Sequence, residues 1–183
     1  MKRCEWAKDE PNITYHDEEW GKPVYDDQKL FEFLLLESAQ AGLSWVTILK
    51  RRDGYRKAFS NFDPEKVAKF NDKKFSGLLQ NEGIIRNRLK IKSAINNAKC
   101  FLEIQKEFGT FSNYLWSFVN HKPIKNKFKK LTELPSSTDI SEKLSLDLKK
   151  RGFTFVGPTI CYALMQAIGM VNDHTKGCFR YQK

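Results

Sequence analysis

This sequence of 183 residues predicts an all-α fold, and three observations lead to that prediction. Apolar residues recur at spacings of three and four along most of the chain, which is the period of an amphipathic helix. Prolines, glycines and short polar residues stand where helices begin and end. Alternation typical of a strand is confined to residues 153–156, which are too few for a sheet, and no repeat of solenoid length is present.

The first strong helical segment is expected to begin at Asp26 or Asp27, either of which can cap a helix N-terminus, and to end at Gly42. One face of this segment carries Leu30, Phe33, Leu34, Glu37 and Ala41. Ser44 can cap the next helix. That helix presents on one face Trp45, Ile48 and Leu49.

Three further helices are expected in the middle of the chain. Asp63 followed by Pro64 is typical of an N-cap and a first helical residue. The clearest amphipathic pattern ends before Gly109. Its apolar positions are Ile91, Ile95, Ala98 and Leu102. A short helix is expected to open at Thr110 or Ser112.

The last third of the chain begins with a segment of different character. Residues 120–135 hold two prolines and many lysines, which predicts a basic surface loop. A helix through Leu144 is expected to run to Gly152. The final helix follows Pro158 and is closed by Gly169.

Composition indicates the kind of partner. Lysine and arginine number 32 against 22 acidic residues, and aromatic residues make up 13% of the chain. A basic chain rich in flat rings suits a ligand that offers both phosphates and bases. We expect many of the rings to lie in the core, because aromatic side chains dominate packing.

The same composition excludes several classes of protein. Hydrophobic residues at 40% are enough for a core, so wholesale disorder is not expected. No span approaches the roughly 20 apolar residues of a membrane helix, and no apolar run follows the first residues as in a secretory signal. We therefore expect a soluble, cytoplasmic protein without a membrane partner.

Both ends of the chain contribute residues to a candidate metal site. Cys4 and His16 lie near the N-terminus, and His174 and Cys178 lie near the C-terminus. Two thiolates and two imidazoles form a common closed zinc shell, whose role is structural because no coordination position stays open. The alternative is a set of surface histidines and inert thiols.

A single domain over residues 1–183 is expected. If a metal ties the ends together, residues 1–25 and 165–183 form a small lobe that packs on a helical core.

Glu37 falls on the apolar stripe of its predicted helix. A carboxylate in such a place must be paired, hydrogen-bonded or shifted in pKa, because an isolated buried charge is very costly. Glu37 is therefore a candidate site residue. The alternatives are that it meets solvent at the helix end or pairs with an arginine in the core.

Trp6, Tyr15, Trp20 and Trp45 form a candidate aromatic group, because three of them lie close in sequence to the proposed metal ligands. Such rings can line one pocket and offer their faces to a flat base. The alternative is that they form the core of the small lobe.

Residues 149–159 combine a basic helix end, a hairpin bounded by glycines and a new helix N-terminus. Backbone N–H groups and positive charge together are what a phosphate requires. Residues 83–88 have similar ingredients. Either segment alone could be a solvated turn.

Taken together, several motifs resemble a known family. They lie in residues 3–6, 15–21, 37–45, 116–120, 149–156 and 171–174. In their order and spacing they resemble the DNA-3-methyladenine glycosylase I family, within the helix-hairpin-helix glycosylase superfamily. The resemblance covers essentially the whole chain and implies a helix-hairpin-helix glycosylase-like helical bundle.

This resemblance implies roles for the candidate residues. It implies one structural Zn²⁺ per chain, with the ligands Cys4, His16, His174 and Cys178. It also implies a pocket for the damaged base, lined by Glu37, Tyr15 and Trp45, with Trp6 nearby. DNA contacts are expected from the turn with Gln40, Gly42, Leu43 and Ser44 and from the hairpin with Lys149, Arg151, Gly157 and Thr159.

Two positions depart from the wider superfamily. Asp173 is the only acidic residue in the stretch after the hairpin where many members place a catalytic aspartate. Because it stands beside the expected ligand His174, we do not assign it that role. Gly157 is followed by Pro158 where a second glycine is usual, which bears on the backbone details of phosphate binding.

The implied activity is hydrolysis of the N-glycosidic bond of 3-methyladenine in double-stranded DNA, by a monomer that flips the nucleotide out of the duplex. Glu37 is the candidate catalytic residue, and free 3-methyladenine is the product. No lysine is placed as a Schiff-base nucleophile, so strand cleavage is not expected. The alternative is a non-catalytic, zinc-stabilised DNA-binding module, which would not need Glu37.

Overall fold

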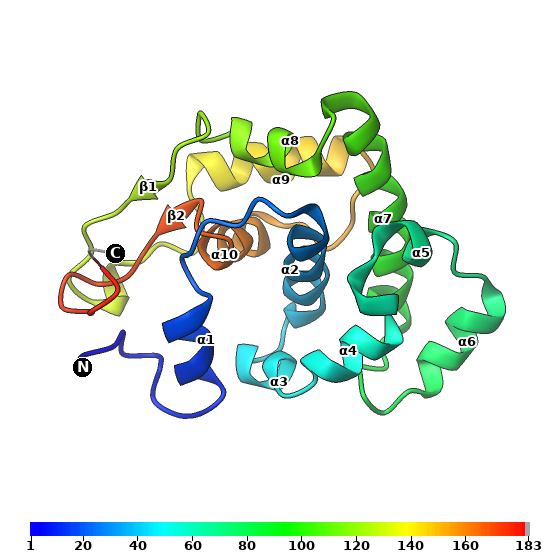
Figure 1. The fold of residues 1–183 in the computed structure, drawn as a ribbon, viewed down its shortest axis with the longest axis horizontal. Coiled ribbons are helices and arrows are strands. Elements are labelled where there is room, and N and C mark those ends of the chain that lie inside the picture. The colour runs from blue at the N-terminus through cyan, green and yellow to red at the C-terminus, as the bar shows by residue number, and fades with distance from the viewer. Residues whose placement is uncertain (182–183) are drawn as a thin grey trace.

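The computed structural model describes residues 1–181, and this part of the chain is almost entirely helical (Figure 1). Its α-helices are α1 (Asn12–Glu18), α2 (Asp27–Gln40), α3 (Trp45–Leu49), α4 (Arg52–Ala58), α5 (Pro64–Ala68), α6 (Asp72–Gln80), α7 (Arg88–Phe108), α8 (Phe111–Ser117), α9 (Asp139–Lys150) and α10 (Pro158–Ala167). Two short 3₁₀ turns are η1 (Ser60–Phe62) and η2 (Leu131–Glu133). The predicted all-α fold class is confirmed.

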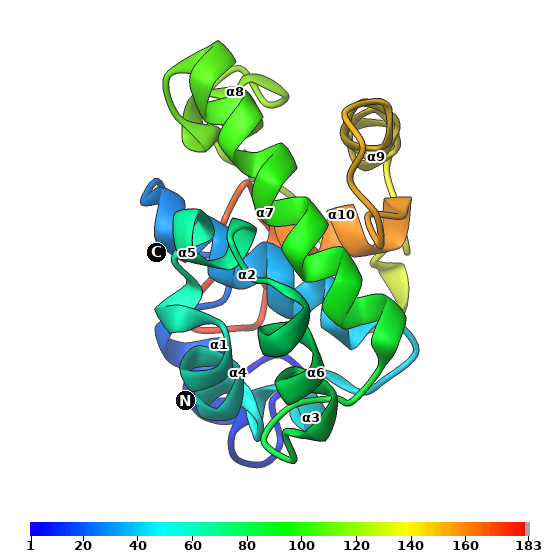
Figure 2. The ribbon, with the colours of Figure 1, turned by 90° about the vertical axis from the view of Figure 1, so that its right-hand side faces the viewer.

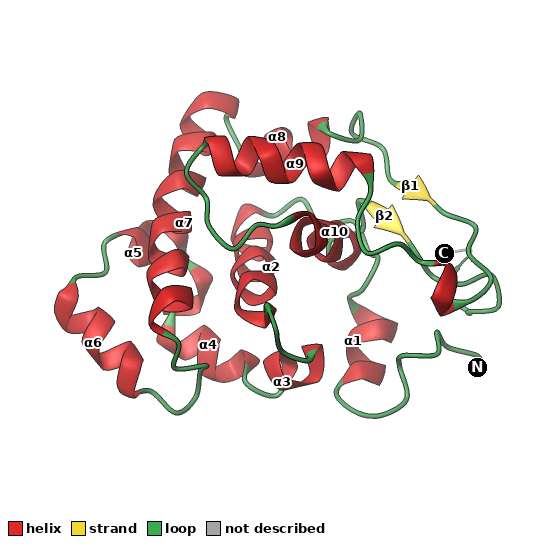
Figure 3. Cartoon of the chain, turned by 180° about the vertical axis from the view of Figure 1, so that it is seen from behind, coloured by secondary structure: helices red, strands yellow, loops and turns green. Residues whose placement is uncertain are grey.

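Helix α2 forms the centre of the molecule. It lies between α7 on one side and α10 on the other, while α8 and α9 cross above them (Figures 1 and 3). Figure 2 shows the long α7 running diagonally across α2. All residues from 30 to 39 of α2 are buried, so this helix is enclosed on every side.

Most predicted helix ends are found where the sequence placed them. The Asp26 carboxylate accepts a hydrogen bond from the Lys29 N–H and caps α2, and Asp63 caps α5 in the same way. Gly42 and Gly109 have φ of 75° and 80°, a left-handed conformation that glycine adopts without strain.

Three helices were not predicted. Helix α1 follows Pro11 and has no side-chain cap, and α4 begins at Arg52 directly after α3, also without one. Helix α6 does carry a signal, because the Asn71 side chain accepts a hydrogen bond from the Lys74 N–H. Short helices of this kind depend on tertiary packing more than on local propensity.

The two short strands do not lie in residues 153–156, where the sequence shows strand-like alternation. Residues 153–156 form an irregular turn, whereas β1 (Ile124–Lys125) pairs in parallel with β2 (Val171–Asn172). The segment of residues 120–135, predicted as a basic surface loop, does lie at the surface, but it also holds the short elements β1 and η2. A two-residue strand has no periodicity of its own and forms only because its partner lies beside it.

The two ends of the described chain meet (Figure 1). The Phe179 N–H donates to the Lys2 carbonyl at 2.9 Å. Within residues 1–181, no helix combines the length and the apolar character needed to cross a membrane.

Candidate active site and metal centre

A pocket of about 380 Å³ opens beside the C-terminal end of α2, a volume suited to a purine base. The four residues expected to surround the base all line it: Trp6, Tyr15, Glu37 and Trp45. Gln40 and Ser44 of the following turn also line it. We call this cavity the aromatic pocket.

Glu37 is 4% exposed, and no hydrogen bond or ion pair joins its carboxylate to another group in residues 1–181. Burial raises the pKa of Glu37 to about 8. Neither alternative from the sequence applies, because the side chain does not meet solvent at a helix end and has no arginine partner. The pocket therefore contains a buried acid with unused hydrogen-bonding capacity.

The rings of the aromatic pocket are inclined to one another rather than stacked. The ring centroids of Tyr15 and Trp45 are 5.3 Å apart with planes at 54°. Burial raises the pKa of Tyr15 well above its usual value, with the neighbouring Glu37 carboxylate as the next cause. The buried Trp45 indole N–H has no hydrogen-bond partner in the described residues. These groups offer ring faces and one free donor to a ligand.

Trp20 connects the aromatic pocket to the candidate metal centre. It is 7% exposed and lines the pocket. Its ring centroid lies 5.1 Å from that of Trp6 and 4.6 Å from that of His174. All four predicted rings therefore line the aromatic pocket, while Tyr15 and Trp20 also belong to the buried core.

Several lining residues were missed by the sequence analysis: Asn12, Val46, Leu131, Leu134, Ala163 and Gln166. Leu131 and Leu134 belong to the segment interpreted as a surface loop. Ala163 and Gln166 share one face of α10 at a spacing of three, but nothing in the sequence shows that α10 lies beside α2. Only the fold brings these segments to the pocket.

The candidate metal ligands are gathered at the meeting point of the two termini. The ligand atoms of Cys4, His16 and Cys178 lie within 4.8 Å of one another, and all three residues are buried. His174 lies beside them, with its ring centroid 5.0 Å from that of His16. Its Nε2 is buried and has no hydrogen-bond partner in the described residues.

Both histidine rings are oriented by a second interaction. The Nδ1 atom of His16 lies 2.7 Å from a carboxylate oxygen of Asp17, and Nδ1 of His174 lies 3.0 Å from the side-chain oxygen of Asn172. Contacts of this kind fix the ring and leave Nε2 for a metal. Cys4, His16 and Cys178 therefore form a cluster that could hold a metal ion, and the chemistry of His174 beside it fits a fourth ligand.

Asp173 does not project into the aromatic pocket. It is 1% exposed, and its carboxylate accepts hydrogen bonds from Tyr162 Oη at 2.5 Å, Gln166 Nε2 at 2.8 Å and Asn126 Nδ2 at 2.6 Å. These donors occupy the carboxylate. The geometry agrees with the expectation that Asp173 is not the catalytic aspartate of the wider superfamily.

The turn of residues 40–44 stands at the edge of the aromatic pocket. Gly42 reverses the chain with a positive φ, and Leu43 is partly exposed. The Leu43 N–H donates to the Gln40 carbonyl at 2.7 Å, and Gln40 Nε2 donates to the Leu43 carbonyl at 2.7 Å. The turn thus holds an apolar side chain in a defined position.

The hairpin residues lie together but do not line the aromatic pocket. Lys149 and Thr159 are exposed, and Gly157 is the N-cap of α10. Arg151, in contrast, forms ion pairs with Glu107 at 2.6 Å and Asp147 at 2.7 Å. To bind a phosphate, Arg151 would have to exchange these carboxylates for it.

Comparisons with known proteins identify the family of the chain. The family model of methyladenine glycosylase matches residues 6–181. The chain is 50% identical to the DNA-3-methyladenine glycosylase of Haemophilus influenzae over 96% of both chains. It is also 50% identical to DNA-3-methyladenine glycosylase 1 of Escherichia coli, over 99% of this chain and 97% of that one.

A solved structure shares the fold almost throughout. It is the crystal structure of a tyrosine-to-phenylalanine variant of 3-methyladenine DNA glycosylase I in complex with 3-methyladenine. Its TM-score is 0.96 at 38% identity, with 100% of this chain and 99% of that chain covered. On the evidence of its sequence, its fold and its pocket, the chain belongs to the methyladenine glycosylase family.

Proposed function

We propose that the chain excises 3-methyladenine from alkylated double-stranded DNA by hydrolysing the N-glycosidic bond, and leaves an abasic site for base-excision repair. Membership of the family and the names of its relatives support this. The observation that carries the proposal is Glu37, a buried acid without a partner inside an aromatic pocket of purine size.

The chemistry of the damaged base explains why recognition is the main task. An adenine methylated at N3 in DNA is positively charged and leaves as a neutral molecule, so strong general-acid catalysis is unnecessary. The enzyme must extrude the nucleotide, which costs a few kcal/mol, and let water attack the sugar. The pocket supplies the binding energy that favours the extruded state.

Glu37 and the rings recognise charge and hydrogen-bonding pattern together. A cationic ring against Tyr15 and Trp45 gains roughly 0.5 to 2 kcal/mol over a neutral one. The Glu37 carboxylate accepts hydrogen bonds from the adenine amino group, whereas guanine would present a carbonyl oxygen to it and be disfavoured. Because the pKa of Glu37 is about 8 in the free protein, entry of a cation displaces its proton.

Contacts to DNA are assigned to the two turns. Leu43 fills the space that the extruded nucleotide leaves, as apolar wedges do in other DNA-bending proteins. Lys149, Gly157 and Thr159 hold a phosphate at the hairpin through a positive charge and the N-terminus of α10. Arg151 contributes there once it leaves Glu107 and Asp147.

We assign one structural Zn²⁺ to Cys4, His16, His174 and Cys178. When bound, the ion adds folding free energy and joins the two termini; four protein ligands leave it no position for chemistry. Metal analysis of protein purified without chelator should find close to one equivalent of zinc. A value near zero would refute the assignment.

An assay of base release from alkylated DNA tests the activity directly. Wild-type protein should release 3-methyladenine and leave abasic sites without strand cleavage, because none of the described residues that line the aromatic pocket is a lysine able to form a Schiff base. Binding of alkylated duplex without any base release would instead support the non-catalytic DNA-binding module. We also propose that the enzyme acts as a monomer in the cytoplasm.

A further inference from the structure

Helix α7 carries a stripe of polar side chains that bond to the two segments assigned to DNA contacts: the hairpin, and the turn of residues 40–44 with the end of α2 that leads into it. The stripe consists of Lys90, Ser93 and Asn97, spaced along one face of α7. Ser93 and Asn97 are buried, at 4% and 2% exposed, although they are polar. Such groups are retained in a core only when their hydrogen bonds are satisfied.

At the hairpin, the stripe binds the backbone of Thr154. Asn97 Nδ2 donates to the Thr154 carbonyl at 2.9 Å, and the Thr154 N–H donates to Asn97 Oδ1 at 2.9 Å. Ser93 Oγ donates to the same carbonyl at 3.1 Å. One helix therefore fixes the hairpin through hydrogen bonds that need no regular secondary structure.

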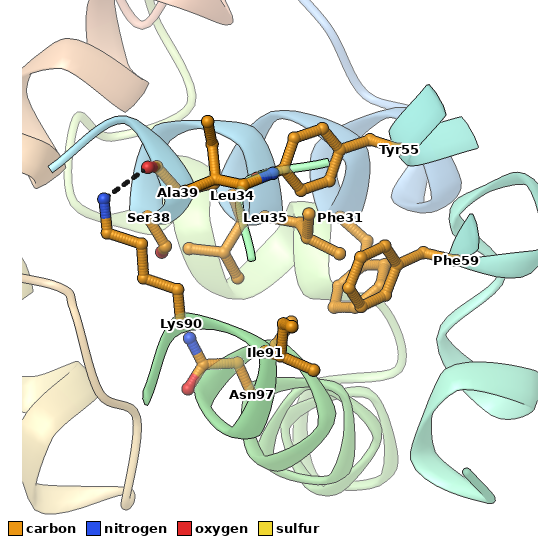
Figure 4. A pocket seen from close by; sticks show the side chains of 12 residues that line it. Phe31, Leu34, Leu35, Ser38, Ala39, Tyr55, Phe59, Lys90, Ile91 and Asn97 are labelled. Atoms are coloured by element: carbon orange, nitrogen blue, oxygen red, sulfur yellow. Dashed lines mark hydrogen bonds between the residues drawn. The ribbon is translucent and has the colours of Figure 1, made fainter. Parts of the chain in front are cut away.

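At the other turn, the stripe ends in Lys90. Its Nζ donates to the Ala39 carbonyl at 2.8 Å, as Figure 4 shows. It also donates to the Ala41 carbonyl at 2.6 Å. Among the backbone hydrogen bonds of residues 1–181, none ends on either carbonyl. The last carbonyls of a helix lack partners within the helix and carry its negative dipole end, so an ammonium group is well suited to them.

The contact is close and has no competing partner. Lys90 is half-buried and forms no ion pair with any acidic residue in the described part of the chain. The cavity behind it, between α2, α4 and α7, measures only about 10 Å³ and cannot hold a ligand (Figure 4). The Lys90 side chain thus acts on the turn rather than on a bound molecule.

We propose that Lys90 is a positioning residue for nucleotide extrusion: its ammonium group holds the turn of residues 40–44 so that Leu43 is presented to the duplex. This inference rests on the wedge role proposed for Leu43. It also explains why α7 bonds to both turns, since the wedge and the phosphate-binding hairpin must keep a fixed distance to act on one duplex.

The test compares Lys90→Met with Lys92→Met, an exposed lysine on the same helix. Lys90→Met should slow single-turnover excision of 3-methyladenine from duplex DNA by about tenfold or more, as expected for losing hydrogen bonds from a charged donor. The dissociation constant for free 3-methyladenine should stay within about twofold of the wild-type value, because substitutions at distant, independent sites affect one another by no more than that. Lys90→Arg, which keeps a cationic donor, should recover most of the rate, and Lys92→Met should match wild type.

A double variant separates positioning from other roles. If Lys90 acts through the turn, adding Lys90→Met to Leu43→Gly should slow duplex excision by no more than about twofold further. Losses that multiply would overturn the proposal. So would a salt dependence of undamaged-duplex binding that falls by about one unit of slope in Lys90→Met alone, because that marks a phosphate contact.

The same measurements keep the two proposals apart. If Leu43→Gly leaves duplex excision unchanged, the wedge role fails and the Lys90 proposal fails with it. If Leu43→Gly is impaired while Lys90→Met equals wild type, the wedge stands and only the Lys90 proposal is overturned. Loss of free-base affinity in Lys90→Met, together with a lower unfolding temperature, would mean that Lys90 supports the fold generally.

Discussion

Helix α2 carries two carboxylates that are equally buried and differently surrounded. Glu32 is 3% exposed and Glu37 is 4% exposed. Glu32 accepts hydrogen bonds from Arg52 at 2.7 Å and from Arg56 at 3.0 Å, and its other oxygen lies 3.0 Å from Nζ of Lys29. Glu37, five residues further on, has no cation from the described chain.

The difference shows that one helix can hold a buried acid that is neutralised by the chain and a buried acid that is not. Arg52 also binds Glu19, at 2.6 Å, and so ties the residues just after α1 to α2 and α4. The cations around Glu32 thus neutralise its charge. The same contacts also fix the helices around the aromatic pocket. Within residues 1–181 no such counter-charge lies against Glu37, and this is the place that the proposed function assigns to the cationic base.

The largest effect is expected from breaking the paired site. Arg52→Ala leaves the buried Glu32 without its shortest partner and should lower the free energy of unfolding by about 3 to 5 kcal/mol. Urea denaturation at neutral pH measures this. A loss below about 1 kcal/mol would mean that the ion pairs of Glu32 contribute no more to stability than exposed ion pairs do. The contrast with Glu37 would then disappear.

Glu37→Gln tests the unpaired site and should act on binding. It keeps the shape of the side chain but removes its charge, and should weaken binding of free 3-methyladenine by about 1 to 3 kcal/mol, the range for hydrogen bonds to charged groups. Titration with the free base measures this.

Single-turnover excision by the same variant separates recognition from proton transfer. The rate should fall by less than the roughly 10²- to 10⁴-fold expected when a general acid or base is deleted. Unchanged affinity would contradict the recognition role. A larger rate loss with intact binding would make Glu37 a catalytic base.

Stability should depend on pH through Glu37. Its pKa is raised from 4.5 to about 8, so between these values the folded protein holds a proton that the unfolded chain has released. Stability is therefore greatest below pH 4.5 for this group and falls as the pH rises toward 8, by at most about 1.4 kcal/mol per pH unit. Denaturation of wild type and Glu37→Gln at several pH values should show this slope only in wild type; parallel curves would mean that Glu37 is not buried in its neutral form.

The smallest effect is expected at the rim of the paired site. The Arg56 side chain is 40% exposed, so its contact with Glu32 is screened by water. Arg56→Ala should lower the free energy of unfolding by less than about 1 kcal/mol. A loss as large as that of Arg52→Ala would show that Glu32 needs every one of its cations.

The sequence predicted an unusual environment for Glu37 but not for Glu32. Glu37 stood out because it interrupts an apolar stripe of helical period. Glu32 did not, because it falls outside that stripe. Since α2 is buried on all sides, its periodic pattern carries little information about which residues are enclosed.

The cluster of candidate metal ligands likewise combines residues that the sequence indicates with an arrangement that it does not. Two cysteines and two histidines are recognisable as a ligand set from their chemistry, yet Cys178 Sγ meets His16 Nε2, at 3.4 Å, across 162 positions of the chain. Leu131 gave no signal at all, because an exposed leucine in a basic segment has no pattern that points to a pocket.

The all-α class, most helix ends and the identity of the chemical groups follow from local sequence, because caps, prolines and apolar periods act over a few neighbouring residues. Long-range packing, in contrast, places α10 and η2 at the aromatic pocket, pairs β1 with β2, and neutralises Glu32 but not Glu37 within the described chain. The physical reason is that desolvation and ion pairing depend on which distant segments pack together, and no local pattern encodes that distance.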